Sequence, residues 1–323
     1  MNIWDWLQLI LGLGLLGIGG EFLVRGASRL ARVLGISPLV VGVTVVAVGT
    51  SAPELAVSLH AAFLGQPDVS IGNVIGSNLL NLLVVLGAAA VVVPLVVAQR
   101  LIWWDIPIMI FATGLVWFCA RDGHLSRVDG IGLLVVLVSY LVAAVRISTG
   151  ESDAVRQEYE KEFSEAAGPG WGGMGREIFL MVAGLLLLVV GAEIFVEGAI
   201  GIARSLGLSE LIISLTIVAV GTSLPELVTA LVAATRGEND IAVGNVVGSN
   251  IMNLLAILGL TALIAPGGLA VPAAVLSFDL PVLLLASVAC LPFLGSGHRL
   301  TRPEGMIFLL AYVGYISWLF YSL

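Results

Sequence analysis

The sequence predicts an all-α integral membrane protein whose ten transmembrane helices form two inverted five-helix repeats. Three observations support this fold class. Of the 323 residues, 59% are hydrophobic and only 11% are charged, and the mean hydropathy is +1.09, whereas soluble domains carry charge at about a quarter of their positions. Apolar segments long enough to cross a bilayer follow one another along the chain. The second half of the chain also repeats the first half.

Glycine, proline and charged residues divide the apolar sequence into ten expected helices. In chain order these helices span residues 4–34, 38–64, 69–93, 99–119, 127–147, 175–206, 210–235, 241–264, 273–294 and 303–321. The first helix has no basic leader and no small-residue cleavage site, so we expect it to remain as an uncleaved anchor. Tryptophans lie near the ends of the first, fourth and tenth helices, where indole rings favour the headgroup boundary.

Polar residues mark the starts of four of these helices. The third and eighth begin near Asp68 and Asp240, which we expect to act as caps. The fifth and tenth begin with sequences that resemble capping boxes, namely Ser126 with Asp129 and Thr301 with Glu304.

Residues 148–174 form the one long polar connection in this pattern. A run of mixed, mostly acidic charges is followed by a Gly-rich segment, and this composition predicts a flexible linker. The chain therefore divides into a first five-helix repeat at 1–147, an acidic and Gly-rich linker at 148–174, and a second five-helix repeat at 175–323.

The internal repeat is visible by direct comparison of the two halves. An ungapped shift of 172 residues places 42–87 on 214–259, with 26 of 46 positions identical. Weaker matches upstream and downstream extend the repeat over five helices in each half. Because five is odd, the second copy enters the membrane upside down. Inverted repeats are typical of secondary transporters, whose ion sites lie near the membrane midplane between the repeats.

Lysine and arginine are distributed unevenly between the two sides of this ten-helix arrangement. Eleven of the fourteen fall on one side, and only Arg121, Arg127 and Arg204 fall on the other. Because basic residues are enriched in cytoplasmic loops, we expect both termini outside the cytoplasm and the linker inside.

No basic cluster of the nucleic-acid-binding kind is present, so nucleic acid is excluded as a partner. We interpret Cys119 and Cys290 as small core residues, because they lie far apart without metal-site spacing.

The second and seventh helices each place a glutamate in mid-span. The second contains AVGTSAPE, which ends at Glu54, and the seventh contains AVGTSLPE, which ends at Glu226. A charge at bilayer depth costs about 2.5 kcal/mol or more, so each glutamate is expected to face a partner or a water-filled cavity. The preceding proline removes an amide and clashes with the carbonyl four residues back. The two prolines therefore predict local unwinding that frees backbone carbonyls, including those of Ala47 and Ala219.

The third and eighth helices carry a second duplicated motif, GNVIGSNLLN and GNVVGSNIMN. In each copy the serine and the last asparagine are four residues apart and share one helix face. Together the motifs supply an all-oxygen set of expected ligands, which are Glu54, Thr50, Ser51, Ser77 and Asn81 from the first half and Glu226, Thr222, Ser223, Ser249 and Asn253 from the second.

Such a ligand set suits a hard cation. Calcium accepts about six to eight oxygens in flexible geometry, whereas magnesium holds its water tightly. Soft transition metals are disfavoured because the chain has no suitably spaced Cys or His. Gly, Ser and Asn also serve close packing in membrane helices, but the duplication of both motifs in register favours an ion site.

The paired motifs GTSAPEL with GNVIGSNLLN and GTSLPEL with GNVVGSNIMN resemble the α1 and α2 repeats of the calcium/cation antiporter superfamily. The chain is most similar to the sodium/calcium exchanger branch and its prokaryotic members. The resemblance implies a ten-helix antiporter that alternates between inward and outward access, with Glu54 and Glu226 as the central calcium ligands. It also implies that the long first and sixth helices slide across the remaining bundle.

By the same resemblance, calcium and sodium positions would be completed by Thr50, Thr222, Ser51, Ser223, Ser77, Ser249 and carbonyls near Ala47 and Ala219. Some relatives carry an acid where Asn253 stands, whereas this chain has Asn at both related positions, 81 and 253. The implied substrates are calcium and sodium ions, with no resident cofactor. The implied location is the plasma (inner) membrane of a prokaryote, in contact with the lipid bilayer and with no obligate protein partner evident.

Two other transport functions remain open. A proton-coupled calcium/cation antiporter could use the same acids, although the GTSxPE motif favours sodium as the counter-ion. A passive cation channel could use the same oxygen ligands, but two central acids on broken helices suit occlusion and alternating access. An enzyme is not expected, because the sequence contains neither HExxH nor GxSxG.

Overall fold

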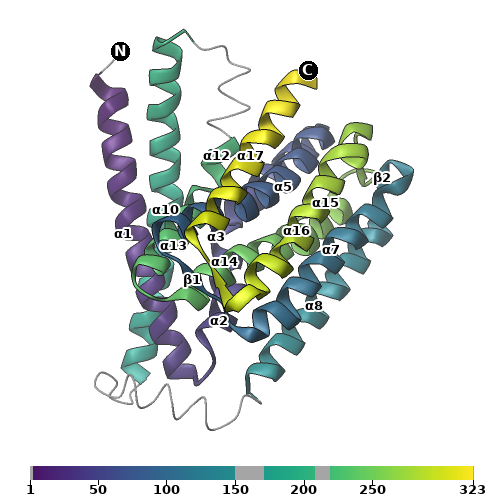
Figure 1. Cartoon of the computed structure of the whole chain (residues 1–323). Helices are drawn as coiled ribbons and strands as arrows, with labels where there is room; N and C mark the ends of the chain where they lie inside the picture. Colours follow the sequence, from purple (N-terminus) through teal and green to yellow (C-terminus); the bar gives the residue numbers. More distant parts are fainter. Residues whose placement is uncertain (1–2, 150–170, 208–218, 323) are drawn as a thin grey trace.

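The computed structural model of the chain describes residues 3–149, 171–207 and 219–322, which form a bundle of helices (Figure 1). In the described residues, seven apolar helical segments are long enough to cross a membrane, or eight if one bent pair counts as a single span. The only strands in this part of the chain are four two-residue segments. The chain is therefore an all-helical, multi-pass membrane protein.

The first half begins with the long helix α1 (Ile3–Leu34). A broken helix follows, composed of α2 (Pro38–Val41), the π-helical turn η1 (Gly42–Val46), α3 (Ala47–Thr50) and α4 (Ala52–Phe63). The remaining helical segments are α5 (Pro67–Leu80) with η2 (Asn81–Val85) and α6 (Leu86–Val92), then η3 (Leu101–Asp105) with α7 (Ile106–Cys119) and η4 (Ala120–Asp122), and finally α8 (Arg127–Thr149).

The second half repeats this order wherever it is described. It begins with α10 (Trp171–Ser205), followed by α12 (Ala219–Thr222) and α13 (Leu224–Thr235). The remaining segments are α14 (Asn239–Met252) with η6 (Asn253–Ile257) and α15 (Leu258–Ile264), then η7 (Val275–Asp279) with α16 (Leu280–Gly295) and η8 (Ser296–His298), and finally α17 (Arg302–Ser322).

Helices occupy every predicted range that the structure describes. The seventh predicted helix lies partly outside the described residues, because 208–218 are not among them. Most of the predicted linker, 150–170, also lies outside them. The described ends of that range are helical rather than linker, since α8 runs to Thr149 and α10 begins at Trp171.

Two short antiparallel ladders join the halves of the chain. Strand β1 (Leu95–Val96) pairs with β4 (Arg299–Leu300), and Leu95 lies opposite Leu300. Strand β2 (His124–Leu125) pairs with β3 (Leu269–Ala270), and Leu125 lies opposite Leu269. The sequence pattern predicted none of these strands.

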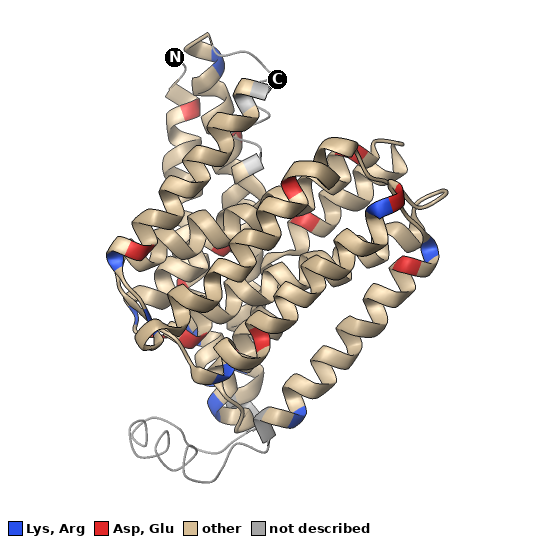
Figure 2. Cartoon of the chain, turned by 45° about the vertical axis from the view of Figure 1, so that its right-hand side comes forward, with Lys and Arg blue, Asp and Glu red and all other residues tan. Residues whose placement is uncertain are grey.

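The helices that carry the GSN motifs lie at the centre of the molecule. In both Pro67–Val92 and Asn239–Ile264, 78% of the apolar window is buried, compared with 33% in Ile3–Leu34 and 28% in Met174–Ser205. Helices α1 and α10 lie side by side at one edge of the bundle (Figure 1). Charged residues gather mainly at helix ends and connections, while the middles of the helices are mostly uncharged (Figure 2).

Helices α1 and α10 approach closely through glycines spaced seven residues apart. A Cβ atom on Gly19 would lie 2.8 Å from the carbonyl oxygen of Gly184, and a Cβ atom on Gly191 would lie 2.9 Å from the amide nitrogen of Leu16. Only glycine allows backbones to come this close, as is common where membrane helices pack. The two helices are therefore held in antiparallel contact along much of their length.

Candidate functional site

Two helix breaks bring both predicted glutamates to the centre of the bundle. Ser51 separates α3 from α4 with φ −83° and ψ 6°, and Ser223 separates α12 from α13 with φ −94° and ψ 8°. The segments on either side of the first break are bent by 43°. Because a proline follows each break at the start of the next helix, Glu54 and Glu226 lie in the first turns of α4 and α13. The positive end of the helix dipole favours a carboxylate there.

Reciprocal hydrogen bonds join the two glutamates to opposite halves of the chain. Both Glu54 and Glu226 are fully buried. Ser51 Oγ donates to Glu226 Oε1 at 3.2 Å, and Ser223 Oγ donates to Glu54 Oε1 at 3.1 Å. Thr222 also faces the carboxyl group of Glu54. The site therefore lies between the two halves, and its two serine bonds are related by the 172-residue shift.

Hydroxyl groups from the central helices surround this pair. Ser77 Oγ donates to Glu54 Oε1 at 3.5 Å. Thr50 Oγ1 donates to Asn245 Oδ1 at 3.0 Å and lies 3.4 Å from Ser249 Oγ. The structure thus brings together the threonine, serine and glutamate side chains that the motifs singled out.

The sequence predicted that unwinding would free the backbone carbonyl of Ala47, but the structure differs. The Ala47 oxygen accepts the Ser51 amide at 3.0 Å and the Thr50 hydroxyl at 3.4 Å, so this carbonyl is not free. The reason is that Pro53 removes the hydrogen bond to residue 49 and leaves the bond to residue 47 intact. Ala219 is the first described residue of α12, and the residues just before it lie outside the described ranges.

The two motif asparagines begin matching π-helical turns. Asn81 is the first residue of η2 and Asn253 the first residue of η6, and both are fully buried. Asn253 Nδ2 donates to Asn78 Oδ1 at 3.1 Å, again across the two halves. Within the part of the chain that the structure describes, neither the nitrogen nor the oxygen of the Asn81 side-chain amide has a hydrogen-bond partner. Single π-turns inside α-helices occur frequently at functional sites.

Several buried oxygens at this centre lack a hydrogen-bond partner in the described structure. They are Glu54 Oε2, Glu226 Oε2, Asn81 Oδ1 and Asn253 Oδ1. Buried polar atoms are nearly always paired, and two buried carboxylates require a compensating charge. A hard cation would meet both needs through oxygen ligands. Among the described residues no group of three or more His, Cys, Asp or Glu is placed to hold a metal ion, so such a cation would also depend on hydroxyl, amide and carbonyl oxygens.

Sequence reasoning missed three residues that support the site. Asn73 Nδ2 donates to the Glu54 carbonyl oxygen at 3.2 Å and to Ser58 Oγ at 2.9 Å, and Asn245 accepts from Thr50. Asn73 and Asn245 are 172 residues apart, so the duplication carried a signal for both. Ser58 has alanine at the related position and no such signal.

A buried acidic centre lined by oxygens, inside a multi-pass helical bundle, defines a membrane protein built to bind cations. The chain belongs to the sodium/calcium exchanger family, since the family model described as sodium/calcium exchanger protein matches residues 4–146 and 177–321. This is a family of membrane transporters. The resemblance predicted from the paired motifs is confirmed.

Similar proteins span nearly the whole chain. A protein named CaxA from Alkalimonas amylolytica is 40% identical over 319 residues, which cover 97% of this chain and 98% of that protein. Inner membrane protein YrbG of Escherichia coli (strain K12) is 39% identical over 312 residues, with coverage of 96% and 94%. A solved structure of the sodium-calcium exchanger NCX_Mj, soaked with Na+ and Sr2+, matches with a TM-score of 0.83 and 33% identity, over 98% of this chain and 99% of that one.

Proposed function

We propose that this chain is a secondary active antiporter that exchanges calcium for sodium across the membrane by alternating access. The observation that carries the proposal is the pair of buried glutamates. Each accepts a hydrogen bond from a serine of the other half, and each keeps one buried oxygen without a partner. Membership of the sodium/calcium exchanger family points to sodium and calcium as the transported ions.

In this proposal the two glutamates bind calcium at the centre. Other oxygens complete the calcium and sodium positions, and they belong to Thr50, Thr222, Ser51, Ser223, Ser77, Ser249, Asn81, Asn253 and the backbone near Ala219. A divalent cation neutralises both carboxylates, whereas an empty site leaves two charges buried in a region of low dielectric. Occupation by ions is therefore favoured throughout the transport cycle.

We also propose that ten helices form two inverted repeats at 1–147 and 175–323, joined by the linker at 148–174. Contacts that occur in related pairs support this arrangement. The pairs are Ser51–Glu226 with Ser223–Glu54, the ladder β1–β4 with β2–β3, and Tyr140–Asp105 at 2.8 Å with Tyr315–Asp279 at 2.9 Å. One pseudo-two-fold axis would generate all of them.

The proposed location is the plasma (inner) membrane of a prokaryote, with both termini outside the cytoplasm. The start of α1 and the end of α17 lie at the same end of the molecule (Figure 1). The excess of Lys and Arg on the opposite side favours that side as the cytoplasmic one. The name of the Escherichia coli relative agrees with an inner-membrane location.

Calcium flux in proteoliposomes tests the proposed exchange directly. Vesicles containing the purified chain are loaded with sodium and diluted into sodium-free medium with radiolabelled calcium, and protein-free vesicles serve as the blank. We expect calcium uptake only with the outward sodium gradient. Uptake driven by a proton gradient alone would assign a proton-coupled antiporter. Calcium movement down its own gradient without any counter-ion would assign a channel.

A further inference from the structure

Two helix interfaces that the internal repeat relates to each other differ in the structure. By the 172-residue shift, α1 corresponds to α10 and α13 corresponds to α4. Helix α1 packs along α13, whereas α10 and α4 make almost no contact within the residues that the structure describes. The structure is therefore asymmetric, because one of the two related interfaces is formed and the other is not.

The interface between α1 and α13 is closely packed. A Cβ atom on Gly20 of α1 would lie 3.0 Å from Cγ1 of Val228 and 3.2 Å from Cγ2 of Val232, both on α13. Glycine at this position lets the α1 backbone approach the two valines. Helix α1 ends at the same end of the molecule as the start of α10, which is the side of the linker (Figure 1).

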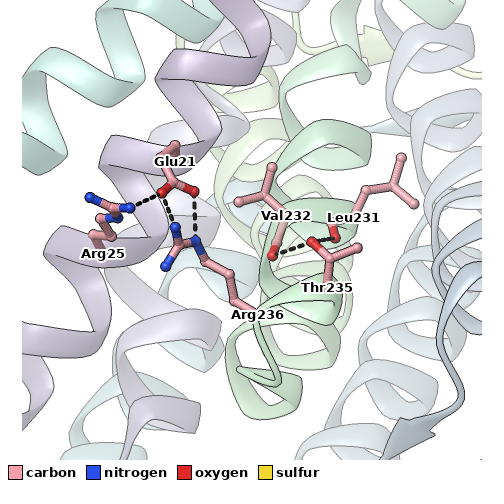
Figure 3. Close-up of polar contacts among 6 residues, drawn as sticks. All are labelled: Glu21, Arg25, Leu231, Val232, Thr235 and Arg236. Carbon is pink, nitrogen blue, oxygen red and sulfur yellow. Dashed lines mark hydrogen bonds and ion pairs between the residues drawn. The ribbon is translucent and has the colours of Figure 1, made fainter.

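A bidentate ion pair joins the two helices beside this packing. Nε of Arg236 donates to Oε2 of Glu21 at 2.6 Å, and Nη2 of the same arginine pairs with Oε1 (Figure 3). Two parallel bonds of this kind fix the orientation of both groups as well as adding energy. Further along α1, Ser28 Oγ donates to Glu238 Oε1 at 2.6 Å. Two polar contacts therefore connect α1 to the end of α13 and to the turn that follows it.

Glu21 also has a second cationic partner on its own helix. Nη2 of Arg25 lies 2.5 Å from Oε1 of Glu21 (Figure 3). If α1 moves away from α13, Arg25 moves with Glu21 and keeps the carboxylate paired. Water can then solvate Arg236, whose side chain is already 35% exposed. The contact between Glu21 and Arg236 can therefore break without leaving a buried, unpaired charge.

The repeat-related positions cannot form the same two contacts. In the order of Glu21, Arg236, Ser28 and Glu238, these positions hold Glu193, Leu64, Ile200 and Gln66. Leu64 offers no charge to Glu193, and Ile200 has no hydroxyl group to donate. An interface between α10 and α4 formed in the same way would therefore lack both polar contacts.

We propose that the Glu21–Arg236 ion pair is a latch that favours the conformation in which α1 packs on α13 and the ion site is closed toward the linker side. This inference rests on the proposed alternating access. In the opposite conformation of an inverted repeat, α10 packs on α4 and α1 leaves α13. An interaction that exists in only one of two conformations shifts their populations by its own free energy. Because the opposite interface has no equivalent ion pair, the chain is biased toward the conformation described here.

Distances between spin labels test the latch without transport. The full chain, with Cys119 and Cys290 replaced by alanine, is placed in lipid nanodiscs with calcium and carries one label pair at a time. The first pair, on Val33→Cys and Thr235→Cys, reports on α1 and α13. The second pair, on Phe63→Cys and Leu206→Cys, reports on α4 and α10. All four labelled positions are exposed.

Glu21→Gln or Arg236→Gln should lengthen the first distance and shorten the second in part of the molecules. We expect the ratio of the opened to the latched population to rise about two- to fivefold, the range for a partly exposed ion pair. Glu21→Arg combined with Arg236→Glu should restore the original distribution, because the ion pair is rebuilt with opposite polarity. The matched control, Glu193→Gln, removes the repeat-related acid and should change neither distance.

Three results would overturn the latch. They are unchanged distances in both single variants, a charge swap that fails to restore the distribution, and an equal change in Glu193→Gln. Lengthening of both label pairs would indicate loosened packing instead of exchange between two conformations, and it would also overturn the proposal. The proposed function is judged separately, by sodium-driven calcium uptake of the unlabelled chain in proteoliposomes.

Discussion

The two central glutamates combine features that are costly without a bound cation. Each is fully buried, each lies in the first turn of a helix, and each has one carboxylate oxygen without a partner. The helix dipole and the neighbouring hydroxyl donors offset only part of the desolvation of a charged group. A cation between them removes the remaining imbalance, so function should depend on both charges.

The first prediction removes these charges one at a time. Glu54→Gln or Glu226→Gln should abolish nearly all sodium-driven calcium uptake, because a site with one negative charge no longer balances a divalent ion. The control is His60→Val, which alters an exposed residue of the helix that carries Glu54 and should retain at least half of the uptake. Robust exchange in Glu54→Gln would show that the site is assigned to the wrong residues.

The serine bonds provide a second prediction, based on their symmetry. Ser51→Ala and Ser223→Ala each remove one hydrogen bond to a carboxylate, an interaction worth about 1.5–3 kcal/mol. Because the bonds have similar lengths of 3.2 Å and 3.1 Å, both variants should raise the calcium concentration for half-maximal uptake by a similar factor, about tenfold or more. A large effect in one variant and none in the other would mean that the halves do not contribute equally.

At the scale of elements, the contact between α1 and α10 depends on glycines at helix positions that face each other. A Cβ atom on Gly19 would lie 2.8 Å from backbone atoms of Gly184 and Leu188, whereas nothing lies within 4 Å of one on Gly17. Gly17 is exposed on the same helix. The two positions therefore form a matched pair that differs in packing alone.

The third prediction compares these two positions. Gly19→Ala should lower the unfolding midpoint in detergent, since overpacking typically costs about 1–3 kcal/mol. Gly17→Ala should leave it unchanged or raise it, because alanine is favoured over glycine in helices by about 1 kcal/mol. Thermal unfolding followed by size-exclusion chromatography measures both. Equal midpoints for the two variants would contradict the close contact between α1 and α10.

The helices and strands also show which parts of the fold local sequence patterns predict and which parts they do not. Hydrophobic runs and Gly or Pro boundaries predicted the positions of the described helices, because those signals are local. Helix α10 begins at Trp171, before the predicted start at residue 175, because membrane helices tolerate glycine and this Gly-rich segment is helical. The β1–β4 and β2–β3 ladders join residues far apart in sequence, so no local pattern could predict them.

Most residues of the candidate site could be predicted from the internal repeat, whereas the helices were predicted from local sequence signals. Its glutamates, serines and asparagines occur twice in register, and duplication separates them from residues kept for packing alone. Ser58 lacks that support, because its related position is Ala230. It is fully buried and accepts a hydrogen bond from Asn73, and only the three-dimensional structure reveals it.

At the scale of the whole molecule, the fourth prediction concerns orientation. A reporter fused after Leu323 should behave as periplasmic or extracellular, and a protease site inserted near Gly168 should be cleaved only from the cytoplasmic face. The reason is the excess of basic residues on the linker side. A cytoplasmic signal from the carboxyl-terminal reporter would contradict the helix number or the assignment of sides.

The last prediction concerns electrical coupling of the two transported ions. With Asn at both 81 and 253, the described site carries two formal negative charges, those of Glu54 and Glu226. One calcium ion neutralises them, whereas three sodium ions would leave the site at +1. Unequal loaded charges mean that exchange moves net charge, and a membrane potential then contributes about 2.3 kcal/mol per elementary charge per 100 mV. We therefore expect electrogenic exchange, with faster calcium export when the interior is negative.

Vesicles whose voltage is clamped with valinomycin and potassium measure this effect on sodium-driven calcium flux. Equal rates at about 0 and −100 mV would indicate an electroneutral ratio of two sodium ions, or another counter-ion, because a net charge must respond to the potential. The family resemblance implies that potassium-dependent relatives carry an acid where Asn253 stands. Because this chain has Asn at that position, we also expect no potassium requirement. Replacing potassium with choline, with the voltage set by other means, tests that expectation. Loss of flux in choline would show that Asn at this position does not decide potassium use.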